Sequence, residues 1–148
     1  FICSNKIKIG AYTRCAYESQ FVDSNFHFVL NMKTGNVTRR ESEILIGKCN
    51  WIGNRTSITK GSKTKDFSII CAGSLMNKDY TQNEENFIML GGSPAKVLTS
   101  GLKRIFSTEI EKDIIYFFNN NPKANNYNLT SELSDDFKDI HYWFEHMM

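Results

Sequence analysis

An aliphatic or small residue recurs at every sixth position through the middle of the chain. The series from residue 46 to residue 76 is Ile46, Ile52, Ile58, Thr64, Ile70 and Met76. Four places after each of the first five stands a small or medium-sized polar residue: Asn50, Thr56, Ser62, Ser68 and Ser74. A helix repeats every 3.6 residues and a strand every two, so a period of six fits neither element alone. It predicts a chain that runs straight and then turns a corner, with three faces closing each coil of a β-helix, rather than a loop-rich β-sandwich.

The same period appears upstream and is then interrupted. Ile9, Cys15 and Phe21 are six apart, but the step from Phe21 to Ile46 is not a multiple of six. We therefore predict that residues 24–45 form a loop extruded from a coil, and loops on a regular scaffold often carry function. Cys15 occupies an aliphatic position of the repeat, and we expect it to be buried there as a small apolar residue.

The chain changes character after residue 100, where a helical pattern replaces the repeats. Leu102, Phe106, Ile110, Ile114 and Phe118 step by four, which predicts an amphipathic helix over residues 102–121. Thr108 and Glu111 form a capping-box pattern, and Pro122 should end the helix. A second helix is expected from about Ser134. We divide the chain into a β-helix domain, 1–100, and a C-terminal helical extension, 101–148, whose His141 and His146 are not expected to be catalytic.

Composition limits the classes of function. The 148 residues carry a net charge of +2, which implies no strong attraction to nucleic acid or to anionic membranes. No apolar run is long enough to span a membrane. The four cysteines form no CxxC pair, which disfavours a zinc site, and we expect reduced thiols and a cytoplasmic protein.

Two segments carry a family resemblance. The stretch IGKCNWIGNRTSITKGSKTKDFSIICAGSLMNKDY, residues 46–80, and GGSPAKVL, residues 91–98, resemble the hexapeptide-repeat acyltransferases, most closely the sugar and polysaccharide O-acetyltransferases. The resemblance covers residues 7–100. It implies an all-β, left-handed parallel β-helix that assembles as a homotrimer and transfers acetyl groups from acetyl-CoA to a sugar hydroxyl. Thr64 departs from the pattern, because an aliphatic residue is usual there.

His27 is the candidate catalytic residue. Transfer to a hydroxyl needs a base that takes the proton as attack begins, and the ordinary pKa of histidine, near 6.5, suits that role. His27 ends the segment DSNFH, and the resemblance implies that it is the general base of a direct transfer. A carboxylate, Asp23 or Glu43, or a main-chain carbonyl would hold its tautomer. Asp23 is our candidate, although it could equally cap the turn.

The resemblance also implies a set of residues that contact acetyl-CoA: Trp51, Asn54, Ala72, Ser74, Asn77, Lys78 and Lys96. Lys78 and Lys96 are suited to the phosphates as point charges. Trp51 would pack beside the pantetheine arm or shield a corner of the coil. In the family the arm lies between two neighbouring chains, which is why a homotrimer is expected.

Three alternatives remain open at the level of the sequence. An N-acetyltransferase that acts on an amino sugar uses the same scaffold. A metal-dependent hydratase similar to γ-carbonic anhydrase needs three histidine ligands, and only His27 lies in the β-helix, so we expect no metal site. A non-catalytic trimeric β-helix that serves as a binding module is the third alternative.

Overall fold

The computed structural model describes residues 1–129, which fall into two compact units divided between Arg104 and Ile105. Strands make up the first unit and the helix α1 lies in the second. The strands are β1 (Ile7–Ile9), β2 (Arg14–Cys15), β3 (Gln20–Val22), β4 (Val29–Leu30), β5 (Val37–Thr38), β6 (Ile44–Ile46), β7 (Trp51–Ile52), β8 (Ser57–Thr59), β9 (Ile69–Ile70), β10 (Leu75–Met76), β11 (Met89–Gly92) and β12 (Ala95–Thr99).

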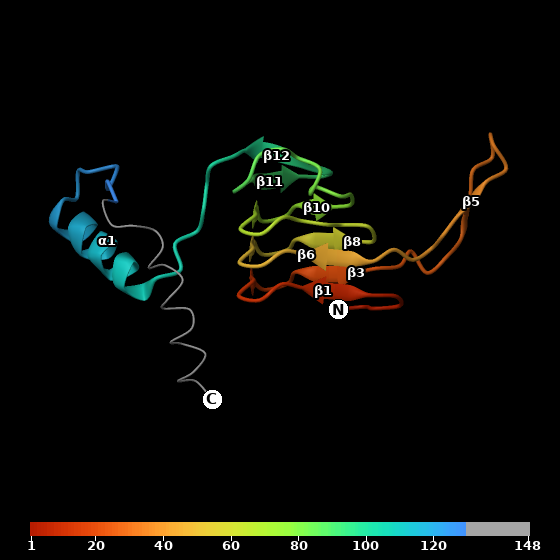
Figure 1. The fold of residues 1–148 in the computed structure, drawn as a ribbon, viewed down its shortest axis with the longest axis horizontal. Coiled ribbons are helices and arrows are strands. Elements are labelled where there is room, and N and C mark those ends of the chain that lie inside the picture. The colour runs from red at the N-terminus through yellow and green to blue at the C-terminus, as the bar shows by residue number, and fades with distance from the viewer. Residues whose placement is uncertain (130–148) are drawn as a thin grey trace, which may run out of the picture. The chain divides into compact units, whose positions relative to one another are not determined.

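Successive turns of the chain in the first unit stack on one another (Figure 1). Parallel pairing produces three sheets, β1–β6, β3–β8–β10 and β2–β7–β9–β11, and β12 closes the last sheet as an antiparallel partner of β11. Ile52 pairs with Ile70, and Ile58 with Met76, so one turn advances the chain by three six-residue repeats. The sequence period is therefore the length of one face of this stack.

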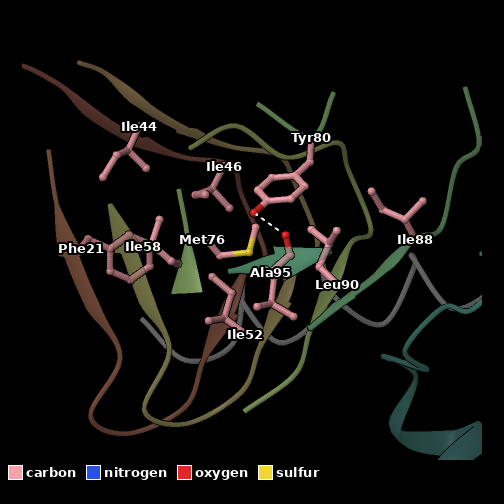
Figure 2. Packing of buried hydrophobic residues seen from close by; sticks show 11 residues of the cluster. Phe21, Ile44, Ile46, Ile52, Ile58, Met76, Tyr80, Ile88, Leu90 and Ala95 are labelled. Atoms are coloured by element: carbon pink, nitrogen blue, oxygen red, sulfur yellow. Dashed lines mark hydrogen bonds between the residues drawn. The ribbon is translucent and has the colours of Figure 1, made fainter. Parts of the chain in front are cut away.

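The repeat positions fill the interior of the stack. Ile46, Ile52, Ile58 and Met76 are buried and pack together between the sheets (Figure 2), and Ile70 belongs to the same buried cluster. Each fully buried side chain of this size stabilises the fold by about 1.5–3 kcal/mol. The interior also accommodates Thr64, because its hydroxyl accepts the main-chain N–H of Gly47 at 3.1 Å.

Small polar residues stand at the corners because their side chains bond the turning backbone. The hydroxyl donates to the carbonyl three residues earlier at Thr56 (2.8 Å), Ser62 (2.6 Å), Ser68 (3.0 Å) and Ser74 (2.6 Å). Asn50 donates to the carbonyls of Lys48 and Lys65, on two successive coils. These groups are buried, so the bonds lower the cost of placing polar side chains at the corners, although Oδ1 of Asn50 has no hydrogen-bond partner among residues 1–129.

The position of Cys15 corrects the expectation that it is buried. Cys15 pairs with Ile52 in the common register, but its side chain is exposed. The reason is its place at the end of the stack, because β2 has a neighbouring strand on one side only. Cysteines 3, 15, 49 and 71 form no disulfide.

The interrupted period corresponds to an insertion between β3 and β6. Cys15 and its partner Ile52 are 37 residues apart, whereas Ile52 and Ile70 are 18 apart, so the first turn carries 19 additional residues. They include the antiparallel hairpin of β4 and β5, which projects from the stack (Figure 1). The hairpin thus leaves the register of the coils unchanged on either side of it.

The helix α1 spans Thr108–Asn120, which corrects the predicted start at residue 102. Ser107 is the N-cap, since its hydroxyl accepts the N–H of Ile110 at 3.3 Å, and Thr108 is the first helical residue. The segment before Ser107 does not join the helix because the backbone of Ser107 is extended, with φ −69° and ψ 121°. The helix ends before Pro122, as predicted, and the second predicted helix lies outside the described residues. None of the helices within residues 1–129 combines the length and apolar character needed to cross a bilayer.

Candidate functional site

His27 lies at the base of the inserted loop, before the hairpin begins. Its N–H donates to the carbonyl of Asn25 at 2.7 Å, and the N–H of Asn25 donates to the carbonyl of Arg40 at 3.0 Å. The guanidinium of Arg40 returns a bond to the carbonyl of Phe26 at 3.3 Å. The two ends of the loop are therefore tied together around His27.

The His27 side chain is exposed. Among residues 1–129 its imidazole has no hydrogen-bond or ion-pair partner, so both ring nitrogens are accessible to a ligand within this chain. An anchored backbone with an open imidazole is compatible with a general base, which must meet an incoming hydroxyl.

Asp23 lies four residues before His27, and its side chain is fully buried. Its two oxygens accept the main-chain N–H groups of Ser4, Asn5 and Lys6 at 2.7–2.8 Å, and the Cys3 thiol at 3.5 Å. Burial raises the pKa of Asp23, but these bonds outweigh it and hold the pKa below its ordinary value. This arrangement favours the second role that we considered for Asp23, capping a turn, over contact with His27.

Glu43 is the other carboxylate near the loop, at its returning end. It accepts Lys63 at 3.0 Å and Lys6 at 3.2 Å, and these two bonds lower the pKa of Glu43. Glu43 is therefore engaged by two ammonium groups. Neither candidate carboxylate bonds to His27 in this chain.

Trp51, Asn54 and Ala72 lie close to one corner of the stack. Asn54 and Ala72 follow β7 and β9, and the coils are in contact here because the carbonyl of Asn54 accepts the N–H of Gly73 at 2.9 Å. A Cβ on Gly53 would lie 2.5 Å from the nitrogen of Ala72, so only glycine fits beneath it. Trp51 is 44% exposed on β7.

Asn77 and Lys78 lie at a different corner, the one that follows β10. Both are exposed. One coil below, the ammonium of Lys60 donates to the carbonyl of Arg39 at 2.7 Å, which links this corner to the loop of His27. The predicted residues thus fall into two groups, one near Trp51 and one on the side of His27, while Lys96 is exposed on β12.

Ser74 differs from the other predicted cofactor residues. It is 2% exposed and its hydroxyl donates to the carbonyl of Cys71 at 2.6 Å, as in the equivalent serines of the other coils. Its side chain belongs to the corner of the coil, and we leave it out of the proposed site.

Two features of the site were not expected from the sequence. Arg40 anchors the loop of His27, and Arg104 lies over the ring of Trp51, 5.6 Å from its centroid. The two consecutive arginines at the returning end of the loop, Arg39 and Arg40, could have indicated the anchoring role of Arg40 from the sequence. Nothing in the repeat pattern relates Arg104 to Trp51. Within the described part of the chain, no three His, Cys, Asp or Glu side chains gather as a metal site would require.

Solved structures with the same fold include several acetyltransferases. The polySia-specific acetyltransferase NeuO is 18% identical over 96% of this chain and 61% of its own, with a TM-score of 0.55. The polysialic acid O-acetyltransferase OatWY is 22% identical over 76% and 54%, with a TM-score of 0.58. A galactoside acetyltransferase in complex with coenzyme A is 24% identical over 64% and 44%, with a TM-score of 0.50.

These similarities confirm, at the level of the fold, the likeness to hexapeptide-repeat acyltransferases. The chain spans about half the length of the solved structures that it matches, from 44% to 61%. No protein-family model and no curated protein sequence matches it.

Proposed function

We propose that the protein is an acetyl-CoA-dependent O-acetyltransferase that acts on a sugar or polysaccharide hydroxyl. The observation that carries the proposal is the exposed His27, anchored where a loop leaves a stack of hexapeptide coils of the acetyltransferase fold. The proposal includes a left-handed parallel β-helix and a homotrimer. The reduced cysteines and the need for acetyl-CoA favour the cytoplasm.

In the proposed reaction His27 acts as general base. One ring nitrogen accepts the proton of the sugar hydroxyl while its oxygen attacks the thioester carbonyl of acetyl-CoA. The tetrahedral intermediate collapses with cleavage of the carbon–sulfur bond, and the CoA thiolate takes the proton from the imidazolium. A main-chain N–H is the proposed donor to the oxyanion.

The other ring nitrogen needs an acceptor to fix the tautomer. Asp23 and Glu43 are both engaged elsewhere, which favours a main-chain carbonyl for this task. We propose that Asp23 acts indirectly, by holding the N-terminal segment against the root of the loop.

The proposed cofactor residues support an assembly of several copies. Asn54 and Ala72 lie at one end of the β8 and β10 strands, and Asn77, Lys78 and the loop of His27 lie at the other. A three-residue strand such as β8 spans about 10 Å. If one copy presents the corner of Asn54 and Ala72 and a neighbouring copy presents the corner of Asn77 and Lys78, both groups can contact the same acetyl-CoA.

The test is thiol release from acetyl-CoA with a panel of neutral, acidic and amino sugars. Wild type is compared with His27→Ala and with the matched control His141→Ala. We expect His27→Ala to lower the rate by at least ~100-fold, with CoA affinity unchanged, because general base catalysis contributes about that much. His141→Ala should retain full activity.

Other outcomes contradict specific parts of the proposal. Release that survives His27→Ala removes this residue from the mechanism. Transfer to amino groups alone supports the N-acetyltransferase. Absence of CoA binding would indicate a non-catalytic β-helix, and a monomeric mass in sedimentation would exclude the trimer.

A further inference from the structure

A groove of about 540 Å³ runs along the β1–β6 face of the stack, outside the residues proposed to contact acetyl-CoA. Its floor is a column of outward-facing residues on successive coils. Lys8 pairs with Leu45, Leu45 bridges to Lys63, and Lys63 bridges to Asp79. The residues on either side of Lys8, Leu45 and Lys63 are buried or pack against the core, so these three positions face the solvent.

The groove is rich in ammonium groups. Lys6, Lys8, Lys48 and Lys63 line it. Glu43 neutralises part of this charge by pairing with Lys6 and Lys63. The side chains of Lys8 and Lys48 are exposed, and neither has a hydrogen-bond or ion-pair partner within residues 1–129. Two ammonium groups that are unpaired among the described residues are thus available in this groove.

Fixed acceptor oxygens and an apolar side chain also line the groove. Asp66 accepts the N–H of Lys48 at 2.7 Å, and Asp79 accepts the N–H of Thr81 at 2.8 Å, so both carboxylates are held in place. Leu45 is only partly buried and contributes an apolar surface. A ligand that fits this groove must carry anionic groups for the lysines, hydroxyl donors for the two aspartates and a C–H surface for Leu45.

We propose that this groove binds an acidic oligosaccharide. Its carboxylates contact Lys8 and Lys48, and its hydroxyls donate to Asp66 and Asp79. A nucleic acid backbone fits less well, because its closely spaced phosphates would meet these two aspartates. Strands of successive coils lie about 4.8 Å apart, so the three steps of the column from Lys8 to Asp79 cover about 14 Å, the length of roughly three sugar units.

The groove adjoins the loop of His27. Glu43, which pairs with two lysines of the groove, immediately precedes β6, where the inserted loop returns to the coil. A bound chain can therefore extend toward the loop and present a hydroxyl there. This last step rests on the proposed function, whereas binding in the groove does not.

Binding is measured by titration calorimetry on the full chain without acetyl-CoA. The probes are oligogalacturonate and α-2,8-linked oligosialic acid, the methyl ester of each, and a single-stranded DNA of equal charge. The variant Lys8→Ala/Lys48→Ala is compared with Lys33→Ala/Lys123→Ala, which removes the same charge from the hairpin and from the second unit. Circular dichroism and a thermal melt establish that each variant is folded.

We expect at least one acidic oligomer to bind, its affinity to fall with salt, and its methyl ester to bind at least tenfold more weakly. Lys8→Ala/Lys48→Ala should weaken binding by about tenfold, and the control pair by less than twofold. The inference is overturned if neither acidic oligomer binds, if the control pair causes an equal loss, or if the DNA binds as tightly. His27→Ala should bind the oligomer as wild type does, which separates a failure of the groove from a failure of the proposed chemistry.

Discussion

The Asp23 carboxylate accepts the main-chain N–H of Ser4 at 2.7 Å, across 19 residues of sequence. It accepts the N–H groups of Asn5 and Lys6 with its other oxygen, so one buried side chain organises three consecutive N–H groups. This anchor lies where β3 ends and the loop of His27 begins. The N-terminal segment and the candidate catalytic loop therefore share one support.

Replacing Asp23 by alanine should destabilise the protein by about 2 kcal/mol, because three N–H groups lose their acceptor in a partly buried site. The free energy of unfolding, measured in urea, tests this. Asp66→Ala is the matched control, since that exposed carboxylate accepts one main-chain N–H, and its effect should be clearly smaller. Equal stability of Asp23→Ala and wild type would contradict the anchoring role.

The stability of the protein should fall at acid pH, and Asp23 should account for part of the fall. Its pKa is lowered in the folded state by the bonds from Ser4, Asn5 and Lys6, although burial opposes them. Such a group contributes its full stabilisation above the unfolded pKa, near 3.9, and loses it as the pH falls through the folded pKa. Urea unfolding between pH 3 and pH 7 measures this slope.

The variant Asp23→Asn isolates that contribution, because an amide does not titrate. Below about pH 4 its stability should depend on pH less steeply than that of wild type. The pKa of Asp79 is also lowered, chiefly by the Thr81 hydroxyl, so some pH dependence should remain. Identical slopes for the variant and wild type would show that Asp23 does not contribute.

Replacing Ser74 by alanine separates a structural from a cofactor role. The variant loses the bond to the Cys71 carbonyl, so stability should fall by about 1 kcal/mol. CoA affinity should stay the same, because the hydroxyl faces the interior of the coil. Ser62→Ala, the equivalent change at another corner, should behave alike. A selective loss of CoA binding in Ser74→Ala would return this residue to the site.

Gly47 should tolerate no larger residue, because the next coil lies directly above it. A Cβ there would lie 2.5 Å from the main-chain carbonyl of Lys65, and we expect Gly47→Ala to cost at least ~2 kcal/mol. Gly35 is the comparison, since it has a φ of +71° but open space around it. Gly35→Ala should cost only about 1 kcal/mol, the strain of a left-handed backbone. Both are measured as shifts of the urea midpoint.

The sequence alone determined the period, the interior positions and the place of the insertion. Each depends on interactions within one repeat. An aliphatic side chain must face the interior, and the polar side chain at a corner must bond a nearby main-chain carbonyl. The end of α1 followed equally from Pro122, which acts locally. Its start did not, because the apolar spacing continues back to Leu102, whereas the backbone is extended at Ser107, whose hydroxyl caps α1.

Only the tertiary structure decided how the candidate site is arranged. Asp23 is close to His27 in sequence, yet its partners are Ser4, Asn5 and Lys6, because the end of β3 lies beside the N-terminal segment. Cys15 has the interior register but is exposed, since its strand has a neighbour on one side only. The lysines of the groove come from different coils and meet on one face. The repeat determines whether a side chain points inward or outward, whereas the stacking of the coils determines which residues it contacts.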